Sequence, residues 1–219
     1  MNKNKPVKFP NPIFITGVDG SGKSFYAEKL IDALNKKGVP AHHLWSRFNN
    51  ITSKPLLAFC RLIGLNYYEK HGDVLIGYHD FEQSSIVSQL FILLQLFDVW
   101  ITTIIRIWPH IMRGHVLVCD RGAYDTLVDV MVDTKNVSLY QTIIGKAFLL
   151  LLPKSHMVLH ISREHQKIFK FRPDVEIDKN FNLRYDLYET CKKAFGWEHV
   201  DNNGTPEETY KKICMELNL

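Results

Sequence analysis

The chain has 219 residues, of which 46% are hydrophobic and 23% charged, and its formal net charge is +4. These values are ordinary for a globular protein and exclude a disordered or collagen-like chain. The mild positive charge suits a small anionic ligand and does not indicate a nucleic acid. The length favours a single domain over residues 1–219, and the four widely spaced cysteines indicate reduced thiols in a cytoplasmic protein.

The hydrophobic pattern predicts strands and helices that alternate along the chain. We expect residues 1–9 to form a flexible tail that is not a secretory signal. Residues 66–80 are turn-rich and have no clear pattern, and the charged segment 163–179 is typical of a mobile lid. Strands are predicted at 12–16, 39–46, 115–119, 157–161 and 198–200. Helices are predicted at 22–38, 51–65, 86–108, 126–152 and 180–195, with a last helix from Pro206 that Thr205 and Glu208 cap. This order implies an α/β fold with a parallel sheet of about five strands and helices on both faces.

The segment 86–108 is long and apolar enough to be tested as a membrane span. Its polar residues fall on one narrow helical stripe, which favours a long core helix with one wet edge over a span. We therefore expect no membrane association, and we expect the helix to end at Pro109. The stripe consists of Ser88, Gln95, Asp98, Thr102 and Arg106.

A phosphate-binding motif follows the first predicted strand. The segment from Gly17 to Ser24 reads GVDGSGKS and matches G-x-x-x-x-G-K-[ST] in full. Glycines allow backbone N–H groups to surround phosphate oxygens, and the following helix points its positive end at the same anion. Lys23 would reach the β- and γ-phosphates of ATP, and the Ser24 hydroxyl would bind Mg²⁺. The ATP-binding residues predicted here are Gly17, Asp19, Gly20, Ser21, Gly22, Lys23 and Ser24.

A second element supports this interpretation. The strand 115–119 runs directly into Asp120 and Arg121. Ligands of open α/β sheets bind at the carboxyl ends of strands, so Asp120 is predicted beside the Mg²⁺ and Arg121 beside the transferring phosphates. The simpler alternative is an aspartate that caps the next helix. Among P-loop proteins, a GTPase would need an N-K-x-D segment to read its base, and the sequence 35–38 (NKKG) breaks that pattern. A small phosphotransferase is the class that remains.

These motifs, in this order, resemble the thymidylate kinase family of nucleoside monophosphate kinases. The likeness covers roughly residues 12–217 and includes the acidic P-loop, Ser46-Arg47, Asp120-Arg121 and a basic lid. It implies the P-loop three-layer sandwich and a homodimer packed partly through the long apolar helix.

The resemblance also implies roles for individual residues. Asp19 would lie near the sugar hydroxyl of the acceptor, and Arg47 and Arg121 would hold its phosphate. Some family members carry a catalytic arginine in the P-loop, where this chain has Ser21, so the cation should come from the lid. Arg172 is the first candidate for it, and Arg163, Lys167 and Lys170 are weaker ones.

The chain departs from the family where the thymine base would be read. At the positions that correspond to the base-contacting residues of the family, this chain has Val99, Gly122, Asp125-Thr126 and Val130. Asp125 is therefore a candidate for contact with a different acceptor, with a capping role as the alternative. His156 and His160 alternate on one strand face without a third ligand, so no histidine metal site is predicted. His42 and His43 are expected to flank a strand.

Together these features predict an enzyme that uses Mg²⁺ and ATP and transfers the γ-phosphoryl group to a nucleoside monophosphate, dTMP or a related nucleotide. The predicted catalytic residues are Lys23, Asp120, Arg121 and Arg172, with Ser24 and Asp120 as metal ligands. Two alternatives stay open. One is a kinase for another small acceptor, such as a nucleoside, a phosphorylated sugar or a lipid precursor. The other is a nucleotide-binding regulator without phosphotransfer.

Overall fold

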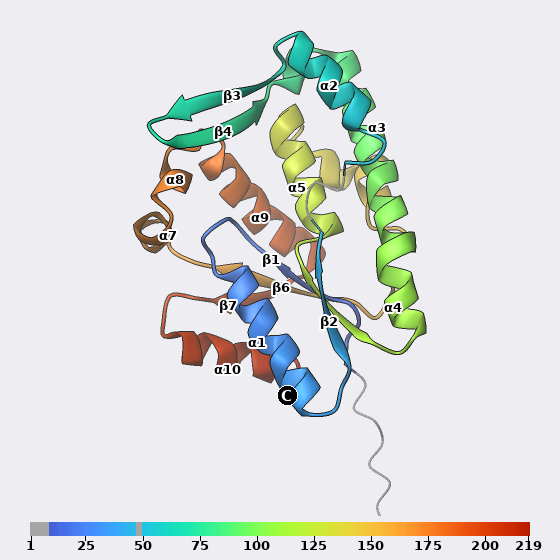
Figure 1. The fold of residues 1–219 in the computed structure, drawn as a ribbon, viewed down its shortest axis with the longest axis vertical. Helices are drawn as coiled ribbons and strands as arrows, with labels where there is room; N and C mark the ends of the chain where they lie inside the picture. The colour runs from blue at the N-terminus through green and yellow to red at the C-terminus, as the bar shows by residue number, and fades with distance from the viewer. Residues whose placement is uncertain (1–8, 47–49) are drawn as a thin grey trace, which may run out of the picture.

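A central five-stranded sheet organises the protein (Figure 1). The computed structural model describes residues 9–46 and 50–219. The strands lie in the order β2-β5-β1-β6-β7, and every neighbouring pair is parallel. They span Ile13–Thr16 (β1), Ala41–Trp45 (β2), Val116–Asp120 (β5), Met157–Ser162 (β6) and Glu198–Asp201 (β7). The predicted α/β class and the five-stranded parallel sheet are confirmed.

Helices connect these strands and cover both faces of the sheet. The longer ones are α1 (Lys23–Lys36), α2 (Lys54–Leu62), α3 (Ser85–Thr102), α5 (Ala123–Thr134), α9 (Phe181–Phe195) and α10 (Pro206–Glu216). The shorter ones are α4 (Trp108–Met112), α6 (Ile143–Ala147), α7 (His165–Phe171) and α8 (Pro173–Glu176). Short 3₁₀ turns lie at Phe81–Gln83 and Leu139–Gln141. The predicted cap of the last helix is confirmed, because Thr205 and Glu208 form a capping box.

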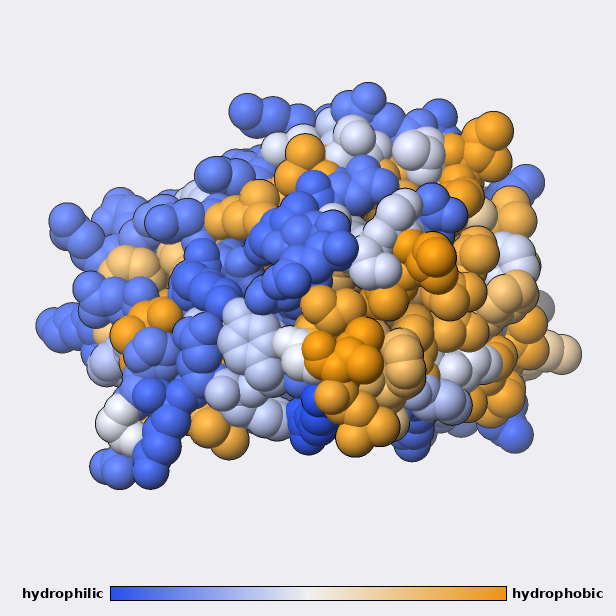
Figure 2. Space-filling view, turned by 90° about the horizontal axis from the view of Figure 1, so that it is seen from above, coloured by the Kyte–Doolittle hydropathy of each residue, from blue (hydrophilic) through white to orange (hydrophobic). Residues whose placement is uncertain are grey.

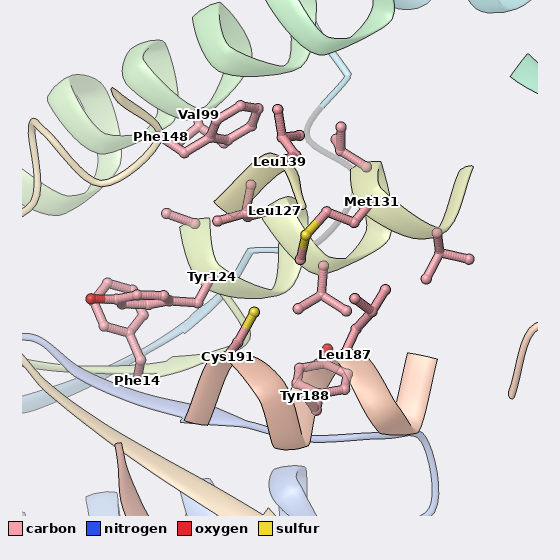
Figure 3. Close-up of a cluster of buried hydrophobic side chains, with 14 of the residues drawn as sticks. Phe14, Val99, Tyr124, Leu127, Met131, Leu139, Phe148, Leu187, Tyr188 and Cys191 are labelled. Atoms are coloured by element: carbon pink, nitrogen blue, oxygen red, sulfur yellow. The ribbon is translucent and has the colours of Figure 1, made fainter. Parts of the chain in front are cut away.

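The alternation of side chains along β1 divides the core in two. Ile13 and Ile15 point into a cluster that α1 and α10 close, whereas Phe14 points into a larger one that α3, α5 and α9 close. All three side chains are fully buried. Figure 3 shows the larger cluster, in which Leu127 of α5 lies between the sheet and α3. Burial on both faces is what a central parallel strand requires.

The long apolar helix continues past the predicted end. α3 passes through a π-helical turn at Thr103–Ile107 into α4, so Ser85–Met112 forms one helical run of 28 residues. The prediction that it ends at Pro109 was wrong. Pro109 follows directly on the π-helical turn, and the altered hydrogen-bond pattern of that turn lets the helix continue past a residue that has no N–H group. The run is long and apolar enough to cross a membrane by length and composition, but half of its most apolar 18-residue window is buried inside the fold.

Most of the polar stripe on this helix faces inward, so the predicted solvent-exposed edge is wrong for its middle part. Gln95, Asp98 and Thr102 are buried, Ser88 is half-buried, and only Arg106 at the end of the stripe is exposed. The Asp98 carboxylate accepts hydrogen bonds from the Thr52 backbone N–H at 2.6 Å and from the Ser53 hydroxyl at 2.6 Å. The stripe therefore anchors the start of α2, and an apolar side of the helix is left outside. Figure 2 shows hydrophobic side chains gathered on that side of the molecule.

A hairpin occupies the segment that had no predicted element. β3 (Asn66–His71) and β4 (Val74–His79) form a separate antiparallel pair, with Gly72 at a φ of +61° in the turn. The hairpin contacts the 163–179 segment through Lys179, whose Nζ lies 2.5 Å from the Tyr67 hydroxyl. That segment carries α7 and α8 and is more regular than expected. The expected tail lies outside the described residues except for Phe9, which packs against the smaller core cluster.

Candidate active site

A glycine-rich loop joins β1 to α1, and its backbone conformation requires glycine at three positions. Gly17, Gly20 and Gly22 have φ angles of +138°, +83° and +101°, which side chains disfavour. A Cβ atom on Gly17 would lie 2.4 Å from the Ile161 carbonyl oxygen, and one on Gly22 would lie 2.8 Å from Asn202 Nδ2. The loop is therefore held tightly against β6 and the 201–205 segment, with its N–H groups beside the start of α1.

Lys23 opens α1 and is almost fully buried, with 5% of its side chain exposed. Its Nζ donates a hydrogen bond to the Val18 carbonyl at 2.7 Å and lies 4.0 Å from the Asp19 carboxylate. Burial first, and then the positive charge of Arg121, lowers the pKa of Lys23 to about 7. An anion bound at the loop would raise the pKa of Lys23 again, since a negative charge favours the protonated amine.

Asp120 and Ser24 form a pair suited to a divalent cation. The Ser24 hydroxyl donates a hydrogen bond to Asp120 Oδ2 at 2.5 Å. Asp120 is 2% exposed, and its other oxygen, Oδ1, is buried with no hydrogen-bond partner among the described residues. A hydroxyl and a carboxylate with a spare oxygen are ligands that Mg²⁺ accepts. The two residues therefore fit the predicted metal role.

Arg121 follows Asp120 in a left-handed conformation, with φ at +73°. A residue with a side chain adopts this conformation only when its surroundings impose it. Here the Arg121 N–H donates to the Ile15 carbonyl at 3.1 Å, and Nη2 forms an ion pair with Asp19. The guanidinium is thereby turned toward the glycine-rich loop.

Arg172, in the lid segment, also lies beside the glycine-rich loop. It lies between α7 and α8, half of its side chain is exposed, and its guanidinium forms two hydrogen bonds with Asp174, at 2.8 and 2.6 Å. A Cβ on Gly20 would lie 3.5 Å from the Arg172 Cβ, so the lid segment touches the loop.

One cleft of about 440 Å³ collects most of the predicted residues, but Gly17, Ser21 and Asp125 are not in its lining. Its lining includes the aromatic side chains of Phe25, Trp45 and Phe171, each more than half exposed. None of these three aromatic residues was placed at the site from the sequence. No spacing rule identifies them, although Phe25 directly follows the motif. The lining is Asp19, Gly20, Gly22, Lys23, Ser24, Phe25, Trp45, Asp120, Arg121, Phe171 and Arg172.

Other predicted residues are placed differently. Asp125 is fully buried and accepts hydrogen bonds from Thr16, Tyr188 and the Gly122 backbone N–H, at 2.8, 2.8 and 2.9 Å. It holds β1, α5 and α9 together and is not in the lining of the cleft, which favours the alternative capping role over contact with an acceptor. Ser21 is also buried and contributes its backbone carbonyl, which accepts a hydrogen bond from Asn202. Arg47 lies outside the described residues.

The region expected to read a base is closely packed. Val99, Gly122 and Thr126 border a cavity of only about 10 Å³, and Thr126 and Val130 border another of about 20 Å³. A cavity of this size holds about one water molecule. The described residues therefore leave too little space for a pyrimidine ring between α3 and α5.

Comparison with known proteins adds no assignment: no protein-family model matches the chain, and no curated protein matches its sequence.

The buried lysine predicts a pH dependence of stability. In the unfolded chain Lys23 keeps its ordinary pKa of 10.5, whereas in the fold it is about 7. Between these values the unfolded state binds more protons, so rising pH removes a penalty from the folded state. We expect the free energy of unfolding, relative to that of Lys23→Met, to rise from about pH 7 to pH 10 by up to about 1.4 kcal/mol per pH unit. Urea denaturation across this range measures it, with Lys36→Met, an exposed lysine of the same helix, as the control. A constant difference between wild type and Lys23→Met would contradict it.

Proposed function

We propose that this protein is an ATP-dependent phosphotransferase with a P-loop fold, similar to the thymidylate kinases, and that its acceptor is small and already phosphorylated. The observation that carries the proposal is the single cleft in which Lys23, Ser24, Asp120, Arg121 and Arg172 meet beside the glycine-rich loop. Cations and backbone N–H groups there surround a space large enough for phosphate groups. Phosphoryl transfer needs little else from a protein, because it depends on positioning and on charge stabilisation.

The proposed roles follow from these positions. The loop N–H groups and Lys23 would bind the β- and γ-phosphates of ATP, and the anion would draw a proton back onto Lys23. Ser24 and Asp120 would hold a Mg²⁺ ion, which supplies positive charge to the transferring phosphoryl group. Arg121, aimed by Asp19, would hold the acceptor phosphate as a fixed, always-charged donor. Arg172 would add charge from the lid.

A nucleoside monophosphate is the first acceptor to consider, because the family that the sequence resembles uses one. A specific observation favours a second candidate, a phosphorylated acceptor without a base. The cavities between α3 and α5 measure only about 10 and 20 Å³. A roomier cavity of about 220 Å³ opens instead between the hairpin and the lid, where three aspartates and two arginines are mixed with apolar side chains. The size of this cavity, and not the polarity of its lining, is what admits an acceptor of another shape.

We also propose that a second copy of the chain covers the apolar side of the long helix. Ile86, Leu90, Leu93 and Phe97 are exposed there, by 41 to 73%. Their spacing of four, three and four residues places them on one helical face. An exposed apolar face of this length has a large driving force for burial, and an isologous dimer buries the same face twice.

Replacement of the lid arginine tests the proposed mechanism. We expect Arg172→Ala to lower kcat by about 10³- to 10⁵-fold, because charge on the transferring group would lose its partner, with ATP affinity nearly unchanged. Arg163→Ala is the comparison variant, since Arg163 is a weaker candidate in the lid and stacks on Phe171 at 4.4 Å, and its kcat should fall much less. Steady-state kinetics and ATP titration separate the two effects. Equal kcat values for Arg172→Ala and wild type would refute the assignment.

An acceptor panel tests the reaction. ADP release from Mg-ATP would be followed with dTMP, dUMP, UMP, CMP, AMP, GMP and thymidine, and with phosphorylated sugars. We expect acceptor-dependent turnover that Lys23→Ala abolishes, because the buried amine contacts the phosphates. Turnover with the sugars alone would support the second candidate. ATP binding without any acceptor-dependent turnover would contradict phosphotransfer and favour a regulator.

The dimer has its own test. Leu93→Glu places a charge in the middle of the exposed apolar face and should convert a dimer into a monomer in sedimentation experiments, because burial of an unpaired carboxylate is costly. Leu150→Glu, at a leucine 69% exposed outside this helix, is the control. A wild-type protein that sediments as a monomer at all concentrations would contradict the proposal.

A further inference from the structure

Three histidines that are distant in the sequence meet at the end of the sheet opposite the cleft. His42 lies in β2, His110 in α4, and His115 immediately before β5. The glycine-rich loop follows the carboxyl end of β1, whereas these residues lie near the amino ends of β2 and β5. The strands are parallel, so the histidine cluster is remote from the proposed active site.

The fold explains why the three rings converge. His42 pairs with Leu117 across β2 and β5, and His115, two residues earlier, lies on the same face of the sheet. The His115 backbone N–H donates to the His110 carbonyl at 3.1 Å, which closes a turn around Gly114, whose φ is +75°. The His110 and His115 rings are therefore brought together by one turn, and the His42 ring comes from the neighbouring strand β2.

The rings are close enough to share one ion. The centroid of His42 lies 4.5 Å from that of His115 and 5.2 Å from that of His110, and those two lie 6.0 Å apart. One nitrogen from each ring lies within 4.8 Å of the other two. Nitrogen ligands of a tetrahedral zinc ion lie about 3.4 Å apart, given Zn–N distances of about 2.0–2.1 Å. Small rotations, most easily of the exposed His42, would close this gap.

The cluster is also unsatisfied as it stands. Nδ1 of His110 and Nδ1 of His115 are both buried and have no hydrogen-bond partner among the described residues. Buried polar atoms nearly always have a partner, so a bound ligand at these two nitrogens would account for them.

We propose that His42, His110 and His115 form a binding site for a transition-metal ion of the Zn²⁺ class, which ties β2, α4 and β5 together. Three imidazoles favour Zn²⁺, Co²⁺, Ni²⁺ or Cu²⁺ over Mg²⁺ and Ca²⁺, which prefer oxygen ligands. A fourth position stays open to water. Because the site is remote from the cleft, its occupancy changes the stability of the fold and not the proposed phosphotransfer.

The test uses the full chain without a histidine tag, stripped of metal and kept in excess Mg²⁺ so that oxygen-ligand sites are filled. Co²⁺ absorption should show one tetrahedral-type ion per chain, and Zn²⁺ should displace it and raise the melting temperature. His42→Gln and His110→Gln should each weaken binding at least tenfold and remove the Zn²⁺-dependent rise in melting temperature.

His43→Gln is the matched control, because His43 is the exposed neighbour of His42 in β2 and does not belong to the cluster. Its metal affinity should equal that of wild type. His42 is exposed, so its substitution leaves the core intact and decides the question if His110→Gln fails to fold. Absence of a Co²⁺ spectrum, or equal affinity in wild type and His42→Gln, would overturn the proposal.

Discussion

The pairing of β1 with β5 is the constraint on which the candidate site depends. Ile15 lies opposite Asp120, and the carbonyl of Ile15 accepts the N–H of Arg121, so both strands end at the same place. Phe14 and Ile15 are fully buried on opposite faces, and a slip of one residue would exchange them. The two cores thereby fix the register, and the register brings Ser24 within 2.5 Å of Asp120. A hydrophobic pattern thus sets the geometry of a polar site.

The site concentrates charge and backbone strain that the rest of the fold must support. Lys23 is buried with a lowered pKa, Arg121 is left-handed, and Asp120 keeps a buried oxygen without a partner among the described residues. Each of these features is unfavourable for folding. The proposed function would offset two of them, because a phosphate would stabilise the protonated Lys23 and a cation would bind the buried Asp120 oxygen. Asp125 differs from Asp120: its fully buried carboxylate accepts three hydrogen bonds, which hold the surrounding elements in place.

The long helix shows how one element can serve two surfaces. Its inner residues, among them Leu96 and Val99, enter the larger core, and Asp98 anchors the start of α2. Its outer residues are apolar and exposed. The π-helical turn before Pro109 keeps the run continuous and carries His110 to the far end of the sheet, beside His42 and His115. The same helix therefore borders the packed interior, an apolar outer face and the histidine cluster.

The parts of this protein that depend on local chemistry could be predicted from the sequence alone. The strand, glycine-rich loop and helix around Lys23, the acid at the end of β5 and the capped last helix follow from short-range patterns, because turns, caps and buried strands depend on neighbouring residues. Only the tertiary structure decided what depends on long-range packing. It turned the polar stripe of α3 inward, buried Asp125, exposed Trp45 in the cleft and brought His42 to His110 and His115. Periodicity shows that a helix or strand has distinct faces, but which face is buried depends on partners that lie far along the chain.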